Sequence, residues 1–146
     1  MKIFERPALA AIIRQAWDDT PDHFPNVALD AFVVMPNHVH GLLIVTDVGA
    51  SVAPQHAEAL RRPASLSVVM RSFKAAATRE ARMRKLWEGD RLWQPNYYDR
   101  VIRNDLEMDR VREYIAHNPI AWQFDRENPD RLTDENYTRL WGWLET

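Results

Sequence analysis

Two imidazoles separated by one residue are the strongest chemical signal in this chain of 146 residues. His38 and His40 flank Val39 inside an apolar, β-branched stretch, which predicts a strand. Side chains alternate faces along a strand, so both imidazoles would project to the same side. Histidines on an apolar face are costly unless they bind something or find hydrogen-bond partners. We therefore favour a bidentate metal clamp over a pair of satisfied core histidines.

A second candidate pair lies on a predicted helix over residues 104–117. Tyr114 and Asn118 are four positions apart and would share one helix face. A tyrosine hydroxyl, with a pKa of about 10, becomes a useful nucleophile when it attacks a phosphodiester that a divalent cation has polarised. Asn118 could supply an amide oxygen as the third ligand. Taken alone, this helix favours the alternative, in which Tyr114 is a core residue and Asn118 a helix C-cap.

The composition limits the chemistry and the partners. The chain has no cysteine, which excludes disulfides, thiolate zinc sites and a cysteine nucleophile. A bound metal would therefore have hard or borderline character, such as Mg²⁺ or Mn²⁺. The net charge of −2 argues against nucleic acid, yet residues 61–85 hold eight basic residues and one acid. That segment is a phosphate-binding surface or a solvated helix face, and composition alone leaves the choice open.

The elements that must position these residues follow from periodicity and turn signals. They are a helix at 7–20, strands at 29–35 and 38–46 joined by a Pro36–Asn37 turn, a surface loop at 48–65, a basic helix at 67–86, a strand at 92–102 interrupted at Pro95–Asn96, and a helix begun by Asn104 with Glu107 and stopped at Asn118–Pro119. The order is that of a ferredoxin-like α+β sandwich, an antiparallel sheet with helices on one face, whose first strand is missing or reduced to residues 2–4. We expect one domain over 1–146, no signal peptide, no membrane span and a cytoplasmic location.

Two separated motifs resemble those of a known family. Phe32–Leu43 resembles the histidine-hydrophobe-histidine strand of HUH-type single-strand tyrosine transposases of small insertion sequences. Tyr97–Asn104, followed by Tyr114–Pro119, resembles their catalytic-tyrosine helix. The Tyr-Ile-x-x-Asn-Pro form is typical of the branch associated with repetitive extragenic palindromes (REP). The resemblance spans roughly residues 8–122 and leaves an aromatic, acidic tail at 123–146.

The resemblance implies a function and a role for each matching residue. His38 and His40 match the paired metal ligands, and Asn118 falls where relatives place a polar third ligand. Tyr114 matches the nucleophile that forms a 5′-phosphotyrosine bond and frees a 3′-hydroxyl. The family cuts and rejoins single-stranded DNA near a hairpin, with Mg²⁺ or Mn²⁺, and needs no external energy because the covalent link conserves the bond.

Contacts to DNA are expected from cations and one aromatic residue near these motifs. Arg71 and Lys74 could follow the backbone, Arg100 and Arg103 flank the tyrosine helix, and Tyr98 could stack an unpaired base. Without its first strand the sheet would have an exposed edge, which favours a homodimer formed by strand pairing.

Two alternatives remain beside the transposase hypothesis. A relaxase or replication-initiator nickase shares the histidine pair and the tyrosine, but such domains generally belong to larger proteins than 146 residues. A non-catalytic or domesticated nucleic-acid-binding protein would keep the residues and lack the reaction. Covalent adduct formation with a single-stranded substrate distinguishes this binder from the enzyme.

Overall fold

The described part of the chain forms two compact units. The computed structural model describes residues 3–46 and 65–144. The first unit contains the described residues of 1–6, 31–42 and 98–146, and the second those of 7–30 and 43–97. The β-hairpin runs through both, because its turn end belongs to the first unit and its open end to the second. Apart from Ser65, the loop predicted at 48–65 lies outside the described residues.

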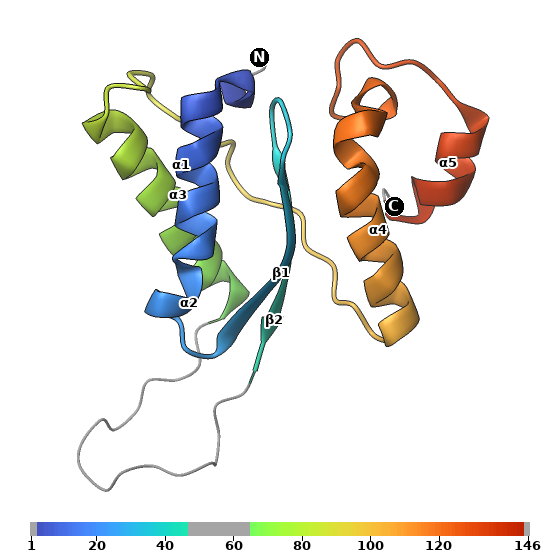
Figure 1. The fold of residues 1–146 in the computed structure, drawn as a ribbon, viewed down its shortest axis with the longest axis horizontal. Coiled ribbons are helices and arrows are strands. Elements are labelled where there is room, and N and C mark those ends of the chain that lie inside the picture. The colour runs from blue at the N-terminus through green and yellow to red at the C-terminus, as the bar shows by residue number, and fades with distance from the viewer. Residues whose placement is uncertain (1–2, 47–64, 145–146) are drawn as a thin grey trace, which may run out of the picture. The chain divides into compact units, whose positions relative to one another are not determined.

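Helices and one small sheet make up these units. In chain order they are η1 (Ile3–Glu5), α1 (Pro7–Asp18), α2 (Thr20–His23), β1 (Val27–Val34), β2 (Val39–Val45), α3 (Leu66–Met83), α4 (Asp105–Ala121), η2 (Trp122–Phe124), α5 (Glu135–Trp141) and η3 (Gly142–Leu144) (Figure 1). The two strands pair as an antiparallel sheet, which confirms the predicted α+β class. The ferredoxin-like arrangement stays a prediction, since only two strands lie within the described residues. None of the described helices has the length and apolar character needed to cross a bilayer.

The hairpin turn is the one predicted. The Met35 N–H donates to the His38 carbonyl at 2.8 Å, which leaves Pro36 and Asn37 as the two turn residues. The Pro36 carbonyl accepts a hydrogen bond from the Phe4 N–H at 2.8 Å, and the Phe4 side chain is buried. Residues 3–5 form a 3₁₀ turn, so they supply no first strand. The N-terminal segment therefore buttresses the turn that precedes β2.

The start of α4 is also as predicted. The Asn104 side chain accepts a hydrogen bond from the Glu107 N–H at 2.8 Å, which satisfies one of the free donors of the first turn. The Glu107 carboxylate accepts from the Arg100 guanidinium at 2.8 Å and from the Arg103 N–H at 3.1 Å. These hydrogen bonds hold the pKa of Glu107 below its ordinary value. The helix that carries Tyr114 thus begins at a defined residue.

The predicted end of this helix is wrong. Helix α4 continues through Pro119 to Ala121 instead of stopping at Asn118. The aversion of a residue before proline to the α region is a bias that surrounding structure can override. Here the Asn118 side chain is 1% exposed. The helical backbone through Pro119 thus carries a buried side chain of the first unit.

The strand predicted at 92–102 is also wrong, because the described chain is irregular from 91 to 103. Asn96 adopts a left-handed backbone with φ of 65°, which interrupts any ladder. The Lys74 ammonium accommodates the nearby carbonyls, donating to Gln94 at 3.2 Å and to Asn96 at 2.5 Å. These two carbonyls therefore accept hydrogen bonds from the Lys74 ammonium. In a β-strand they would accept hydrogen bonds from a neighbouring strand.

Each unit has its own apolar core. In the first, Leu42 of β2 packs with Tyr114 and Ile115 of α4, and Trp141 of α5 covers the cluster. In the second, α1 lies along α3 (Figure 1), and the residues buried on these two helices include Leu9, Ile12, Ile13, Trp17, Val69, Phe73, Ala77 and Ala81. Burial along the histidine face of β2 stops at Leu42, since Ile44 is 38% exposed. The histidines accordingly lie at the buried end of that face.

Candidate metal centre

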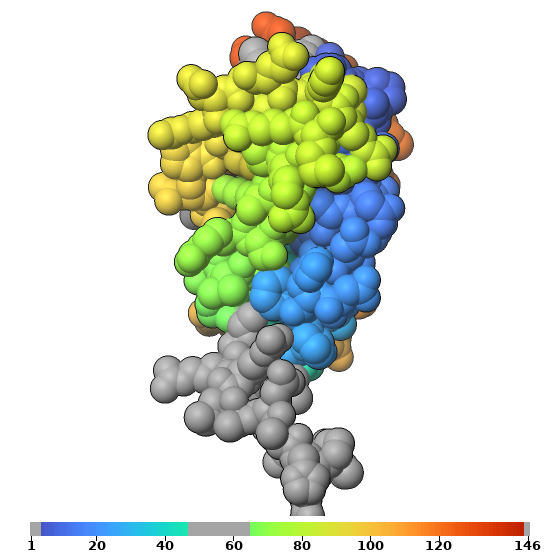
Figure 2. Space-filling view, turned by 90° about the vertical axis from the view of Figure 1, so that its left-hand side faces the viewer, coloured from blue at the N-terminus to red at the C-terminus, as the bar shows by residue number. Residues whose placement is uncertain are grey.

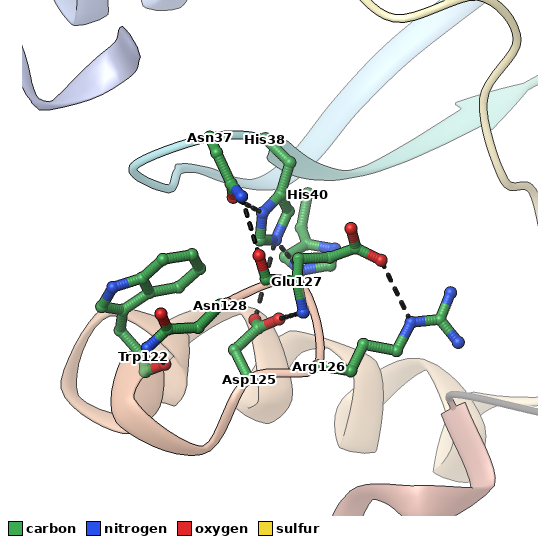
Figure 3. Close-up of polar contacts among 8 residues, drawn as sticks. All are labelled: Asn37, His38, His40, Trp122, Asp125, Arg126, Glu127 and Asn128. Atoms are coloured by element: carbon green, nitrogen blue, oxygen red, sulfur yellow. Dashed lines mark hydrogen bonds and ion pairs between the residues drawn. The ribbon is translucent and has the colours of Figure 1, made fainter. Parts of the chain in front are cut away.

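Three potential metal ligands converge in the first unit. His38 directly follows the hairpin turn and His40 lies on β2, and their Nε2 atoms are 2.9 Å apart. Asp125 reaches the pair from the loop after η2, with its Oδ2 3.7 Å from His38 Nε2 (Figure 3). One ligand atom from each of the three residues lies within 4.8 Å of the other two. The turn and the strand therefore present both imidazoles to one carboxylate.

The loop that carries Asp125 is held by its own hydrogen bonds. The Asp125 N–H donates to the Trp122 carbonyl at 3.1 Å, and the Asp125 carbonyl accepts from the Asn128 N–H at 3.0 Å. Its carboxylate Oδ1 accepts the Glu127 N–H at 2.8 Å. The second oxygen, Oδ2, is buried and has no hydrogen-bond partner among the described residues. One oxygen thus fixes the side chain and the other faces the imidazoles.

Burial disfavours the charged form of both histidines, and the neutral form is the one that binds metals. Burial, followed by the charges of His38 and Arg126, lowers the pKa of His40 to about 3. Burial also lowers the pKa of His38, although the charges of Asp125 and Glu127 oppose it. Protonation of either ring would place a charge in a largely buried site, and a divalent cation would compete with that proton for the same lone pair.

The predicted nucleophile and third ligand lie on one face of α4. The ring of Tyr114 is edge-on to that of His40, with 5.3 Å between centroids, and Tyr114 is 8% exposed. Trp122, two turns further along, lies 5.9 Å from the ring of His38. Asn118 is midway between these two residues on the same helical face. The structure therefore brings Tyr114 beside the histidine pair, and Asn118 as a ligand stays a prediction.

Buried polar atoms without hydrogen-bond partners indicate whether these residues fit a cation. Both amide atoms of Asn118 are buried and, among the described residues, have no hydrogen-bond partner, which is also true of Asp125 Oδ2. Buried polar groups of this kind are uncommon and call for an explanation. Adjacent ligands of an octahedral ion with bonds of about 2.1 Å stand roughly 3.0 Å apart, close to the 2.9 Å between the two imidazole nitrogens. Two imidazoles, a carboxylate and an amide oxygen form a donor set for a borderline or hard divalent cation.

Comparison with known proteins identifies the family of this chain. No protein-family model matches the chain, and no solved structure matches it. A Haemophilus influenzae protein described as "Uncharacterized protein" is 37% identical over 125 residues, covering 81% of this chain and 68% of that protein. The chain belongs to the family of this Haemophilus protein. The chain has a second, more distant similarity that bears on function.

That similarity is to a second Haemophilus influenzae protein, described as "Putative REP-associated tyrosine transposase". It is 21% identical over 142 residues, covering 88% of this chain and 74% of that protein. The match suggests that the family is related to tyrosine transposases. It extends well beyond the histidine motif and includes most of both units.

Three of the residues expected to bind DNA lie in the first unit. Tyr98 is 91% exposed, and the Arg126 guanidinium lies over its ring at 5.3 Å from the centroid. Arg100 is paired with Glu107 and lies over the ring of Trp143 at 5.2 Å. The Arg103 side chain is exposed. Tyr98 thus offers an open ring face beside a cation, whereas the Arg100 charge is largely engaged within the protein.

The other two, Arg71 and Lys74, lie on α3 in the second unit. Arg71 is exposed, while Lys74 holds the irregular segment through two carbonyls, and burial lowers its pKa. Figure 2 shows α3 and the segment after it side by side on one face. An open hollow of about 550 Å³ there is lined by Lys74, Ala75, Thr78, Arg79, Arg82, Met83 and Trp93. Lys74 has a structural role that composition did not indicate.

Sequence reasoning missed two residues of this site. The sequence assigns Asp125 to the acidic tail outside the predicted core, where one carboxylate among six acids carries no signal of burial. The sequence predicts Asn37 only as a turn residue, although its side chain contacts both His38 and the Glu127 carbonyl. The one available signal was its position beside the histidine motif.

Proposed function

We propose that this protein cuts and rejoins single-stranded DNA by the tyrosine transposase reaction, with Tyr114 as nucleophile. The observation that carries the proposal is the convergence, in one compact unit, of Tyr114 with His38, His40 and Asp125. The distant similarity to a protein described as a transposase supports the same reaction class.

The cation of this site would be Mg²⁺ or Mn²⁺, held by His38, His40 and Asp125, with the amide oxygen of Asn118 completing the protein ligands. When bound, such an ion withdraws charge from a scissile phosphate and stabilises the developing charge on the leaving oxygen. Burial opposes protonation of both imidazoles to the charged form, so no imidazolium charge repels the cation. Asp125 supplies the negative charge that partly balances the cation.

Tyr114 carries the covalent step. Its phenol oxygen attacks the phosphorus, the bond from phosphorus to the 3′-oxygen breaks, and a 5′-phosphotyrosine forms. The phenol gives up its proton and the leaving 3′-oxygen gains one, so the step is balanced without an external energy source. Packing of the ring against His40 and Trp141 restricts its orientation, and such restriction is a principal source of rate enhancement. Rejoining is the reverse attack by a 3′-hydroxyl.

The substrate would be single-stranded DNA beside a hairpin. Tyr98 offers an exposed ring to an unpaired base, a contact worth about 1–3 kcal/mol. Arg126 follows Asp125 directly in the chain and lies over that ring, so its charge is placed to attract the phosphate next to the stacked base. Arg103, which directly precedes the cap of α4, adds exposed positive charge. Arg71 does the same on α3.

Adduct formation tests the proposal. Native protein, Mn²⁺ and a hairpin-containing oligonucleotide should give a covalent species on a denaturing gel. Tyr114→Phe should give none, because it retains the ring and removes the attacking oxygen. The same loss of a hydroxyl in Tyr137→Phe, on α5 outside the cluster, should leave the adduct unchanged. An adduct formed by the Tyr114→Phe variant would refute the assignment of the nucleophile.

One observation supports a second candidate, a non-catalytic nucleic-acid-binding protein of the same family. Tyr114 is only 8% exposed and belongs to the apolar core of its unit, as a purely structural tyrosine would. For this candidate the native chain should retard the oligonucleotide on a native gel and give no adduct with any divalent metal. The two gels together separate the candidates.

A further inference from the structure

The side chain of Asn37 joins the two parts of the candidate metal centre. Its Nδ2 donates to the Glu127 carbonyl at 2.8 Å, and its Oδ1 lies 2.7 Å from the Nδ1 atom of His38 (Figure 3). A carbonyl oxygen can only accept, so the amide nitrogen must be the atom that faces Glu127. The amide oxygen must then face His38, and the orientation of Asn37 is determined at both ends.

This orientation determines the tautomer of His38. An amide oxygen only accepts, so the Nδ1 atom of His38 must carry a proton and donate it. In a neutral imidazole the other nitrogen, Nε2, is then an unprotonated acceptor. That nitrogen lies 2.9 Å from His40 Nε2 and 3.7 Å from Asp125 Oδ2. Asn37 therefore makes the lone pair of His38 point into the cluster.

The second hydrogen bond of Asn37 acts on the Asp125 loop. Glu127, whose carbonyl accepts from Asn37, donates its own N–H to Asp125 Oδ1 at 2.8 Å. One residue thus links the hairpin turn to the loop that aims the carboxylate, across 90 positions of sequence. Displacement of this loop would move Asp125 Oδ2 away from the imidazoles and lengthen its 3.7 Å contact with His38 Nε2.

We propose that Asn37 is a positioning residue of the metal centre, which fixes the tautomer of His38 and aligns the Asp125 loop with the histidine pair. It supplies no ligand itself. The inference rests on the proposed metal-dependent function, but the tautomer can be measured without metal. Groups that orient ligating side chains in this way typically change metal affinity about 10- to 100-fold when they are removed.

One variant and one matched control test the role. Nitrogen NMR of the metal-free chain should show His38 protonated on Nδ1 in the native protein, because the Asn37 amide oxygen accepts that proton. Asn37→Ala should shift His38 toward the Nε2-protonated form. Calorimetric titration with Mn²⁺ should give an affinity about 10- to 100-fold weaker for Asn37→Ala. Asn136→Ala, the same change at an exposed residue of α5, should alter neither measurement.

Different failures have different meanings. Native-like Mn²⁺ affinity in Asn37→Ala, or an Nδ1-protonated His38 in that variant, would overturn the positioning role while leaving the metal centre intact. A native chain that binds no divalent cation would overturn the proposed function and with it the role of Asn37 toward metal. If Asn37→Ala does not fold, the native chain decides alone, because an Nε2-protonated His38 in it would contradict the hydrogen bond inferred here.

Discussion

Acidification of the metal-free chain should destabilise the unit that contains His38 and His40. Both imidazoles have a lowered pKa in the folded protein, chiefly because burial disfavours the charged form. In the unfolded chain an imidazole takes up a proton near pH 6.5. The unfolded state therefore binds more protons below that pH, and the free energy of unfolding falls as the pH falls.

The size of the effect follows from the pKa of His40, which is lowered to about 3. When an imidazole stays neutral in the folded protein, the free energy of unfolding falls by about 1.4 kcal/mol for each pH unit below 6.5. At pH 5.0 the loss from His40 is thus roughly 2 kcal/mol, and it continues until the pH approaches the folded pKa. His38 adds a loss of the same sign. A domain of this size has a total stability of about 5–15 kcal/mol, so the change is easy to measure.

Urea denaturation in EDTA at pH 7.5 and pH 5.0 measures this loss. The native chain should lose roughly 2 kcal/mol or more between the two conditions, while His40→Gln should lose clearly less because it has no imidazole to protonate. His117→Gln removes an exposed imidazole of α4 and should keep the native difference. Equal pH dependence in the native chain and in His40→Gln would refute the reasoning, since the loss would then arise elsewhere.

Three further substitutions test other parts of the structure. Asn104→Ala should lower the free energy of unfolding by about 1 kcal/mol in urea denaturation, and no change would mean that the cap of α4 is unimportant. In EDTA, Asn118→Leu should leave the free energy of unfolding unchanged or raise it, because it replaces an unpartnered buried amide. Calorimetry should nevertheless show weaker Mn²⁺ binding, and unchanged affinity would exclude Asn118 as a ligand. Lys74→Met should cost about 1–3 kcal/mol through its lost bonds to two carbonyls; unchanged stability with a lower salt dependence of DNA binding would instead indicate a phosphate contact.

Local patterns predicted the elements that carry the histidines and the tyrosine. The Pro36–Asn37 turn and the Asn104 cap are decided by neighbouring residues, so short-range rules identify them. The end of α4 could not be predicted in this way. There the side chain of Asn118 is buried in its unit, and that packing overrides the preference of a residue that precedes proline.

The strand expected at 92–102 failed for a related reason. Its aromatic and β-branched residues have strand propensity, but that propensity largely reflects packing in a sheet. Lys74, about twenty positions earlier, binds the carbonyls of Gln94 and Asn96 instead. A contact between a helix side chain and a distant backbone leaves no periodic trace in the sequence.

The candidate site was predictable in proportion to how local its residues are. The spacing of His38 and His40 on one strand indicates a metal site, whereas the helix of Tyr114 taken alone favours a core residue and only the family resemblance predicts a nucleophile. Asp125 joins them only through the path of the chain after α4, and its neighbours resemble an ordinary solvated acidic segment. Without the fold, no rule distinguishes this carboxylate from the other acids of the C-terminal segment.

The potential ligands come from two stretches of chain, the hairpin turn and the loop after η2, which Asn37 and Glu127 connect across 90 positions. A cation bound there would act as a reversible crosslink that closes a long loop, and such closure restricts the unfolded ensemble. Unfolding of this unit would disperse the donors and release the ion in the same cooperative event. A fragment that ends with α4 would retain both imidazoles but lack the Asp125 carboxylate.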